Sequence, residues 1–131
     1  FIRKYLPKSW KIKSIHNMKE EQVIKNLMKS KIFLSFTQFE GLGMPPIEAA
    51  LSRNKIIGYT GEGGKEIWKK PIFTEIPNGN ILKFAEEVLK NIEKINLKNS
   101  HIQRKKISAK FSVNNEKKNI IKMVNKLKSL R

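Results

Sequence analysis

The chain has 131 residues, enough for one domain with a buried core. It carries 28 Lys and Arg against 11 acidic residues, a formal net charge of +17, and it contains no cysteine, which excludes disulfides, zinc–thiolate sites and thiol catalysis. No apolar run approaches the roughly 18 residues of a membrane-spanning helix, and no signal-peptide pattern opens the chain, so the sequence predicts a soluble protein.

In chain order, the apolar patterns predict short strands that alternate with helices. Because no hairpin turn joins two strands, this alternation predicts an α/β fold with a parallel sheet. The expected elements are a strand over 11–15, a helix capped by Asn17, a strand over 32–36, a helix over 46–53 with Pro46 first, a strand over 55–59, a short helix over 66–68, a strand over 72–76, a turn at 78–80, and helices over 81–92, 100–110 and 114–130.

Two local features carry further expectations. Ser52, Arg53 and Asn54 end the helix over 46–53 without a glycine, which leaves Asn54 to take any left-handed turn conformation there. The last helix has Ile120, Ile121, Val124 and Leu127 beside five lysines. Packing against its own domain is favoured for this helix, and binding to a membrane surface is the alternative.

The excess of positive charge has three interpretations: a solvated surface, contact with an anionic membrane or lipid-linked acceptor, and nucleic-acid binding. The lysines are spread along the chain, and only four of the 28 cations are Arg, the residue that favours bidentate contacts with bases. A solvated surface is therefore favoured, and nucleic acid is not expected as a partner.

The acidic residues argue against a metal site. All 11 are glutamate, whereas hard divalent cations are usually held by Asp-rich ligand sets. The two histidines, His16 and His101, lie far apart in the sequence. We therefore expect no metal, and a bound diphosphate would be neutralised by Lys, Arg, helix dipoles and backbone amides.

Residues 40–48 are the most informative segment and read Glu-Gly-Leu-Gly-Met-Pro-Pro-Ile-Glu. They follow the apolar run 32–36 and lead into a helical segment. A strand, a glycine loop and a helix let backbone N–H groups approach an anion at the helix N-terminus. Glu40 and Glu48 add two carboxylates, which suits a ligand with both hydroxyls and phosphates. The alternatives are a tight turn without a ligand, an ordinary loop acid at Glu40 and a helix-dipole role for Glu48.

The segments 32–36 and 40–49 resemble the C-terminal, donor-binding domain of retaining GT-B glycosyltransferases of glycosyltransferase family 4. Residues 63–66, Gly-Gly-Lys-Glu, are similar to the family's Gly-Gly-x-x-Glu segment. The likeness covers about residues 14–95. It implies that residues 1–131 form a Rossmann-like three-layer α/β/α domain, with the first βα unit and the acceptor-binding N-terminal GT-B domain missing.

By position, the resemblance implies a role for each residue of the motif. Glu40 would position the donor sugar through its hydroxyls, and Glu48 would accept hydrogen bonds from the ribose. The backbone amides between them would hold the sugar and the adjoining phosphate; they belong to Gly41, Leu42, Gly43 and Met44. A second loop, with Gly63, Gly64 and Glu66, would line the same cleft, although a simple turn explains it equally well from the residues alone.

The resemblance implies a metal-independent hexosyltransferase that needs no cofactor. It would move a sugar from a nucleoside diphosphate sugar to a glycan or lipid-linked acceptor, in the cytoplasm or at the inner face of the membrane. The family's Arg and Lys that clamp the diphosphate are absent from this chain, so we expect these 131 residues alone to be inactive. A non-catalytic GT-B-like domain that binds a nucleotide or a partner is the alternative, and a basic nucleic-acid-binding domain is a weaker one.

Overall fold

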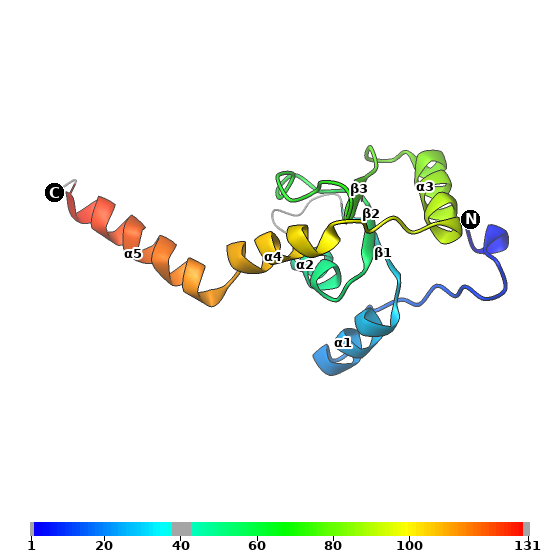
Figure 1. Ribbon diagram of the computed structural model, residues 1–131, viewed down its shortest axis with the longest axis horizontal. Coiled ribbons are helices and arrows are strands. Elements are labelled where there is room, and N and C mark those ends of the chain that lie inside the picture. Colours follow the sequence, from blue (N-terminus) through cyan, green and yellow to red (C-terminus); the bar gives the residue numbers. More distant parts are fainter. Residues whose placement is uncertain (1, 38–42, 130–131) are drawn as a thin grey trace.

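The computed structural model describes residues 2–37 and 43–129. One parallel sheet has the strand order β1-β2-β3, with β1 at Ile32–Ser35, β2 at Lys55–Gly58 and β3 at Phe73–Glu75. The helices are α1 Glu20–Lys29, α2 Met44–Leu51, α3 Ile81–Glu93, α4 Ser100–Lys110 and α5 Val113–Ser129, and a 3-10 turn spans Ile2–Tyr5 (Figure 1). The predicted α/β class and the parallel sheet are confirmed.

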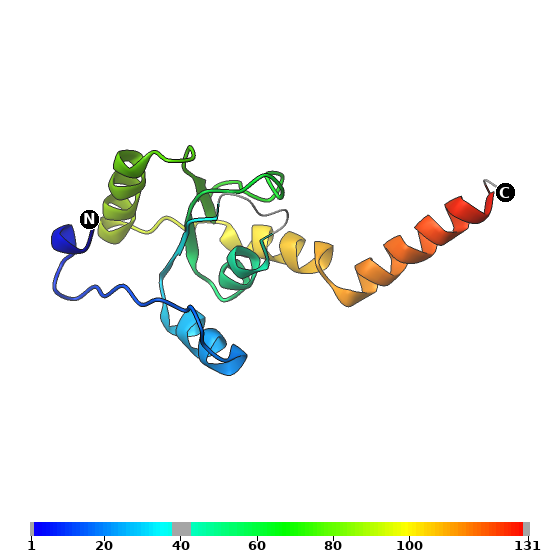
Figure 2. The ribbon, with the colours of Figure 1, turned by 180° about the vertical axis from the view of Figure 1, so that it is seen from behind.

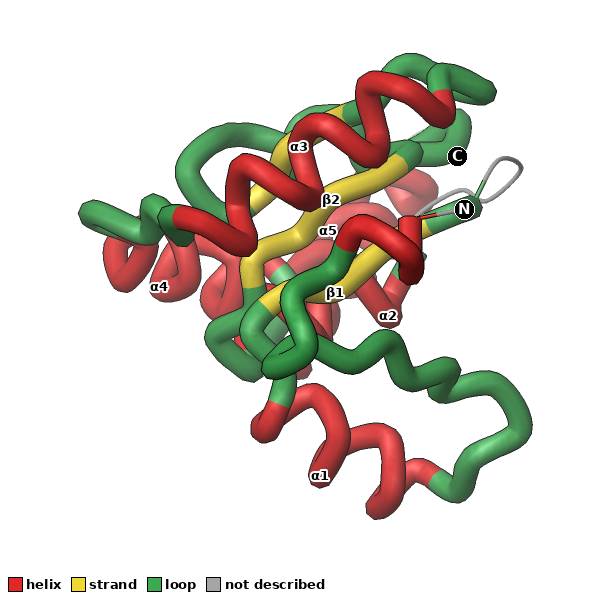
Figure 3. Tube along the Cα trace, turned by 90° about the vertical axis from the view of Figure 1, so that its right-hand side faces the viewer, coloured by secondary structure: helices red, strands yellow, loops and turns green. Residues whose placement is uncertain are grey.

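Helices cover both faces of the sheet (Figure 3). On one face, Phe84 of α3 packs in the same cluster as Ile57 of β2. On the other face, Ile47 of α2 packs in the same cluster as Ile56. Ile56 and Ile57 point to opposite faces because side chains alternate along a strand. The three-layer α/β/α arrangement is therefore confirmed.

The connection from β2 to β3 contains a turn over 65–67 where the pattern predicts a helix over 66–68. Gly64 has a φ of 75°, and the amides of Ile67 and Trp68 donate to the carbonyls three residues back, those of Gly64 and Lys65, so the segment closes as a tight turn and not as an α-helix. The connection is nevertheless well packed, since Ile67 and Trp68 are both buried on the α2 side of the sheet. The Trp68 and Phe73 rings lie 5.3 Å apart.

Two expectations near the N-terminus are wrong. Residues 11–15 form no strand, because Ile12 is exposed and Ile15 is only half-buried, so the segment has little apolar surface to anchor it on the sheet. Asn17 does not cap a helix. It has a φ of 56° and turns the chain, and α1 begins three residues later at Glu20.

Around α2, the boundaries and the turn differ from the expectation. The helix begins at Met44, so Pro46 lies in the first turn rather than at the first position. Arg53, not Asn54, takes the left-handed conformation, with a φ of 69°. Asn54 is instead fully buried, and its side-chain amide donates hydrogen bonds to the carbonyls of Leu27 (2.8 Å) and Ala49 (3.1 Å). This side chain therefore links α1, α2 and the start of β2.

The last helix also departs from the favoured interpretation. α5 has no buried residue, and it extends away from the three-layer body (Figures 1 and 2). The expectation that it packs against its own domain is wrong.

The strands β1 and β2 approach closely at the edge where both end. The Tyr59 amide donates to the Ser35 carbonyl at 3.0 Å, and the Ser35 hydroxyl donates to the Tyr59 carbonyl at 3.2 Å. A Cβ at Gly58 would lie only 1.9 Å from the Ser35 carbonyl oxygen. Glycine is therefore required at position 58 to keep the two strands paired.

We predict that Gly58→Ala destabilises the fold by at least about 3 kcal/mol, because the added methyl forces the strands apart. The matched control is Gly79→Ala. Gly79 has a φ of 78° but no atom within 4 Å of an added Cβ, so this change should cost only about 1–2 kcal/mol of backbone strain. Urea unfolding measures both values, and equal costs would contradict the proposed steric contact.

Lys55, at the start of β2, is a buried cation that is 4% exposed. Its ammonium donates a hydrogen bond to the Pro71 carbonyl. The pKa of Lys55 is lowered to about 8, mainly by burial and in addition by the nearby charge of Lys70, while Glu87 opposes both effects. The charged form of Lys55 is thus disfavoured in the folded state.

The stability of the protein should therefore rise with pH between about 8 and 10.5. In this window the folded state has released the Lys55 proton while the unfolded state still binds it, so deprotonation favours folding. Lys55→Met should remove this part of the pH dependence. Lys83→Met, at an exposed position on α3, is the control and should retain it. Thermal unfolding at a series of pH values tests the prediction, and identical profiles for the two variants would refute it.

Candidate functional site

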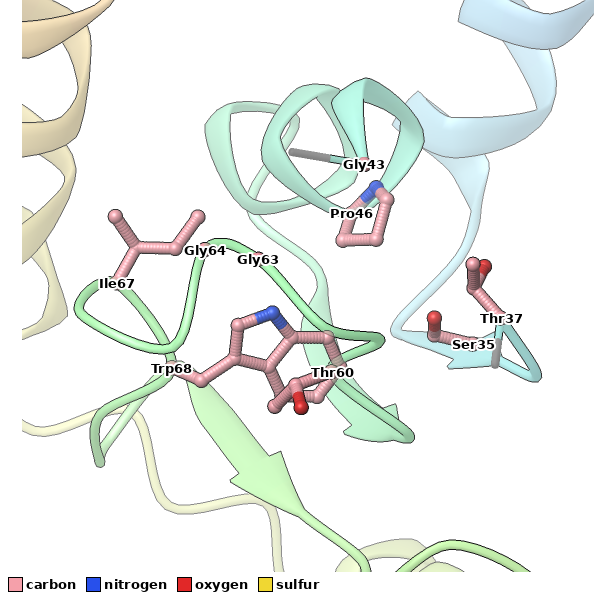
Figure 4. A pocket seen from close by; sticks show the side chains of 9 residues that line it. All are labelled: Ser35, Thr37, Gly43, Pro46, Thr60, Gly63, Gly64, Ile67 and Trp68. Atoms are coloured by element: carbon pink, nitrogen blue, oxygen red, sulfur yellow. The ribbon is translucent and has the colours of Figure 1, made fainter. Parts of the chain in front are cut away.

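The candidate site lies at the edge of the sheet where β1 and β2 end. Because the strands are parallel, the segments that follow them leave the sheet at the same edge, the usual position for ligands in open α/β folds. A small cavity of about 10 Å³ lies there, with room for about one water molecule. Its lining residues, shown in Figure 4, are Ser35, Thr37, Gly43, Pro46, Thr60, Gly63, Gly64, Ile67 and Trp68.

The cavity brings together two glycine segments that are some 20 residues apart in the sequence. Gly43 is the N-cap of α2, and Gly63 and Gly64 belong to the loop after β2. Pro46 and Trp68 extend toward the space between these segments (Figure 4). Three of the residues predicted from sequence therefore border one cavity. A ligand the size of a nucleotide would have to lie over this point rather than inside it, because the cavity holds only about one water.

The N-terminus of α2 offers fewer amides than a typical helix. Gly43 caps it without a side-chain hydrogen bond, and the next helical residues include Pro45 and Pro46, which have no N–H. Only the amides of Gly43 and Met44 can therefore point at a ligand from this end of the helix, with the helix dipole behind them. Glu40, Gly41 and Leu42 lie outside the described residues.

Glu48 is placed on the exposed face of α2, whereas Ile47 and Ala49 on either side of it are buried. Among residues 2–37 and 43–129, no group forms a hydrogen bond or ion pair with its carboxylate. The chain has a net charge of +17, yet this carboxylate has no cationic partner in the described residues. It is therefore available to accept hydrogen bonds from a ligand.

Glu66 is directed elsewhere. Its carboxylate accepts a hydrogen bond from the Lys110 ammonium at 2.9 Å, and this bond lowers the pKa of Glu66. Both residues border a separate hollow of about 430 Å³ between the 66–70 segment and α4. The structure thus brings Gly63 and Gly64 to the cavity at the sheet edge and directs Glu66 toward α4.

Sequence reasoning missed the polar residues that follow the strands. Ser35, Thr37 and Thr60 all border the cavity, and the available signal was their position directly at or after a strand end. Trp68 is buried, and it also forms one wall of the cavity.

Residues 2–37 and 43–129 contain no cluster of three His, Cys, Asp or Glu side chains that could hold a metal ion. No helix in these ranges combines the length and the apolar character needed to span a bilayer.

Comparison of the chain with models of protein families, with curated proteins and with solved structures finds no match.

Proposed function

We propose that this chain is the donor-binding part of a retaining glycosyltransferase. The enzyme would transfer a hexose from a nucleoside diphosphate sugar to a glycan or lipid-linked acceptor, without a metal. With a lipid-linked acceptor it would work in the cytoplasm at the inner face of the membrane.

The observation that carries the proposal is the meeting of Gly43 with Gly63 and Gly64 at the carboxyl edge of a parallel sheet. Glycines without a Cβ allow a ligand to approach the backbone closely at this edge. The free carboxylate of Glu48 lies on the helix that begins there. The backbone amides at this edge, with a carboxylate further along α2 that does not itself line the cavity, suit a ligand with phosphate acceptors and hydroxyl donors.

Each described group has a chemical task in this proposal. The amides of Gly43 and Met44, with the α2 dipole, would donate to phosphate or sugar oxygens. The Glu48 carboxylate would accept from both ribose hydroxyls. Because Pro45 and Pro46 provide no amides, most of the diphosphate charge would be neutralised by cations from elsewhere. Backbone amides that are held in place before the reaction stabilise the negative charge that develops as the diphosphate leaves.

A non-catalytic nucleotide-binding domain of the same fold is the second candidate, because the described site contains binding groups but no evident general acid or base. Donor turnover by a longer protein that includes this chain separates the two. Nucleic-acid binding is distinguished by salt, since phosphate-backbone affinity falls steeply with salt concentration, whereas ribose recognition by Glu48 should be far less sensitive.

We predict that Glu48→Gln weakens binding of uridine or guanosine diphosphate about tenfold, because a charged hydrogen-bond acceptor is lost. The wild-type affinity is expected in the millimolar range, on the order of −4 kcal/mol. NMR titration measures such weak binding, and the amides of Gly43, Met44, Gly63 and Gly64 should shift.

Two controls sharpen the titration. Glu86→Gln removes an equal charge from an exposed position on α3 and should leave the affinity unchanged. Pyrophosphate, which has no ribose, should bind the wild type and Glu48→Gln equally. An equal loss of affinity for pyrophosphate and for the nucleotide would show that Glu48 does not recognise the ribose.

A further inference from the structure

The α5 helix presents an apolar stripe that nothing in the described chain covers. Ile120, Val124 and Leu127 are 49%, 39% and 58% exposed, and their spacing of four and three residues places them on one face. Met123 and Val113 are also exposed and lie beside them at 100° per residue. The stripe runs along most of a 17-residue helix.

The rest of α5 is strongly basic, with five lysines and a single acid, Glu116. At 100° per residue, Lys118, Lys122 and Lys126 lie opposite the apolar stripe, and Lys117 and Lys128 lie along one border of it. At such a border, the methylene groups of a lysine side chain can pack against an apolar phase while its ammonium group stays in a polar layer.

The charges decide between the possible occupants of this face. A second copy would bring five further lysines against these five, and like charges at close range oppose pairing. An anionic surface instead complements every lysine. An apolar stripe with lysines along one border and on the opposite face, and with Glu116 as the only acid at its other border, matches the boundary between lipid headgroups and acyl chains.

We propose that α5 binds an anionic lipid bilayer by lying in the plane of its surface. Ile120, Val124 and Leu127 enter the headgroup–acyl boundary, and Lys117 and Lys128, at the border of the stripe, contact anionic headgroups. Lys118, Lys122 and Lys126, on the polar face, are attracted to the same anionic surface at longer range. The helix is about 25 Å long but polar on one side, so it lies flat rather than crossing. It extends away from the three-layer body, which leaves the stripe accessible (Figure 2).

This inference deepens the location given in the proposed function and rests on it only for the biological setting. Vesicle binding is measured without nucleotide, so its failure leaves donor binding untouched, and the reverse is also true.

The first experiment measures flotation of the full chain with vesicles of phosphatidylglycerol and phosphatidylcholine, and with vesicles of phosphatidylcholine alone. The triple change Lys118→Gln, Lys122→Gln, Lys126→Gln should lower partitioning to the anionic vesicles about tenfold or more. The matched control, Lys8→Gln, Lys11→Gln, Lys13→Gln, removes the same charge from an exposed segment outside α5. A clearly smaller loss in the control supports the proposal. Equal losses would mean that the net charge alone drives binding, and would overturn it.

The second experiment tests the apolar stripe. Ile120→Ser, Val124→Ser, Leu127→Ser should lower partitioning at least about tenfold without changing any charge. The control, Met28→Ser, Ile81→Ser, Leu82→Ser, removes exposed apolar groups from α1 and α3 and should retain binding. Equal effects of the two triple changes would overturn the proposal.

The third experiment uses the absence of cysteine in the chain. An environment-sensitive dye on Val124→Cys should report an apolar environment when anionic vesicles are added, whereas the same dye on Asn125→Cys should not. No change at either position would overturn the proposal. A dimer in the absence of lipid would also overturn the proposal, if the Ile120, Val124 and Leu127 changes abolish it, because a second copy would then cover the stripe. Sedimentation equilibrium without lipid detects such a dimer.

Discussion

The structure depends on the close approach of β1 and β2 at Ser35 and Gly58. The Ser35 carbonyl accepts the Tyr59 amide, and the space where a side chain at position 58 would lie is occupied by the Ser35 backbone. Both segments that follow the strands start from this contact. Their glycines meet at one cavity because the strands that lead into them are paired to their last residues.

The two ends of α2 have different roles. Near its C-terminus, the Arg104 guanidinium donates to the Ala50 carbonyl at 2.9 Å and to the Ser100 hydroxyl at 2.7 Å, and Asn54 donates to Ala49. The Ala50 and Ala49 carbonyls also accept the backbone amides of Arg53 and Asn54, and the added side-chain bonds join α2 to α4 and β2. The N-terminus has no side-chain cap and borders the cavity. A helix held at one end can present its other end to a ligand with little loss of entropy on binding.

The basic character of the chain serves different purposes in different places. At the sheet edge, the described cavity is lined by hydroxyls, glycines and apolar groups, and no lysine borders it. On α5, lysines lie along one border of an uncovered apolar stripe and on the face opposite it. The net charge of the chain thus covers two surfaces with different chemistry, and composition alone does not distinguish them.

The sequence by itself determined the α/β class, the parallel strands, α3 and the glycine motif, because periodicity, turn residues and strand–loop–helix order are local properties. Asn80 illustrates this: it accepts a hydrogen bond from the Lys83 amide at the start of α3, directly after the turn that Gly79 makes. Only the tertiary structure decided the roles of Asn54, Glu66 and α5. Asn54 is buried because α1 and α2 end against it, Glu66 pairs with a lysine 44 residues away, and α5 lacks a partner within the described chain. Contacts between distant segments decide such outcomes, and no local pattern encodes them.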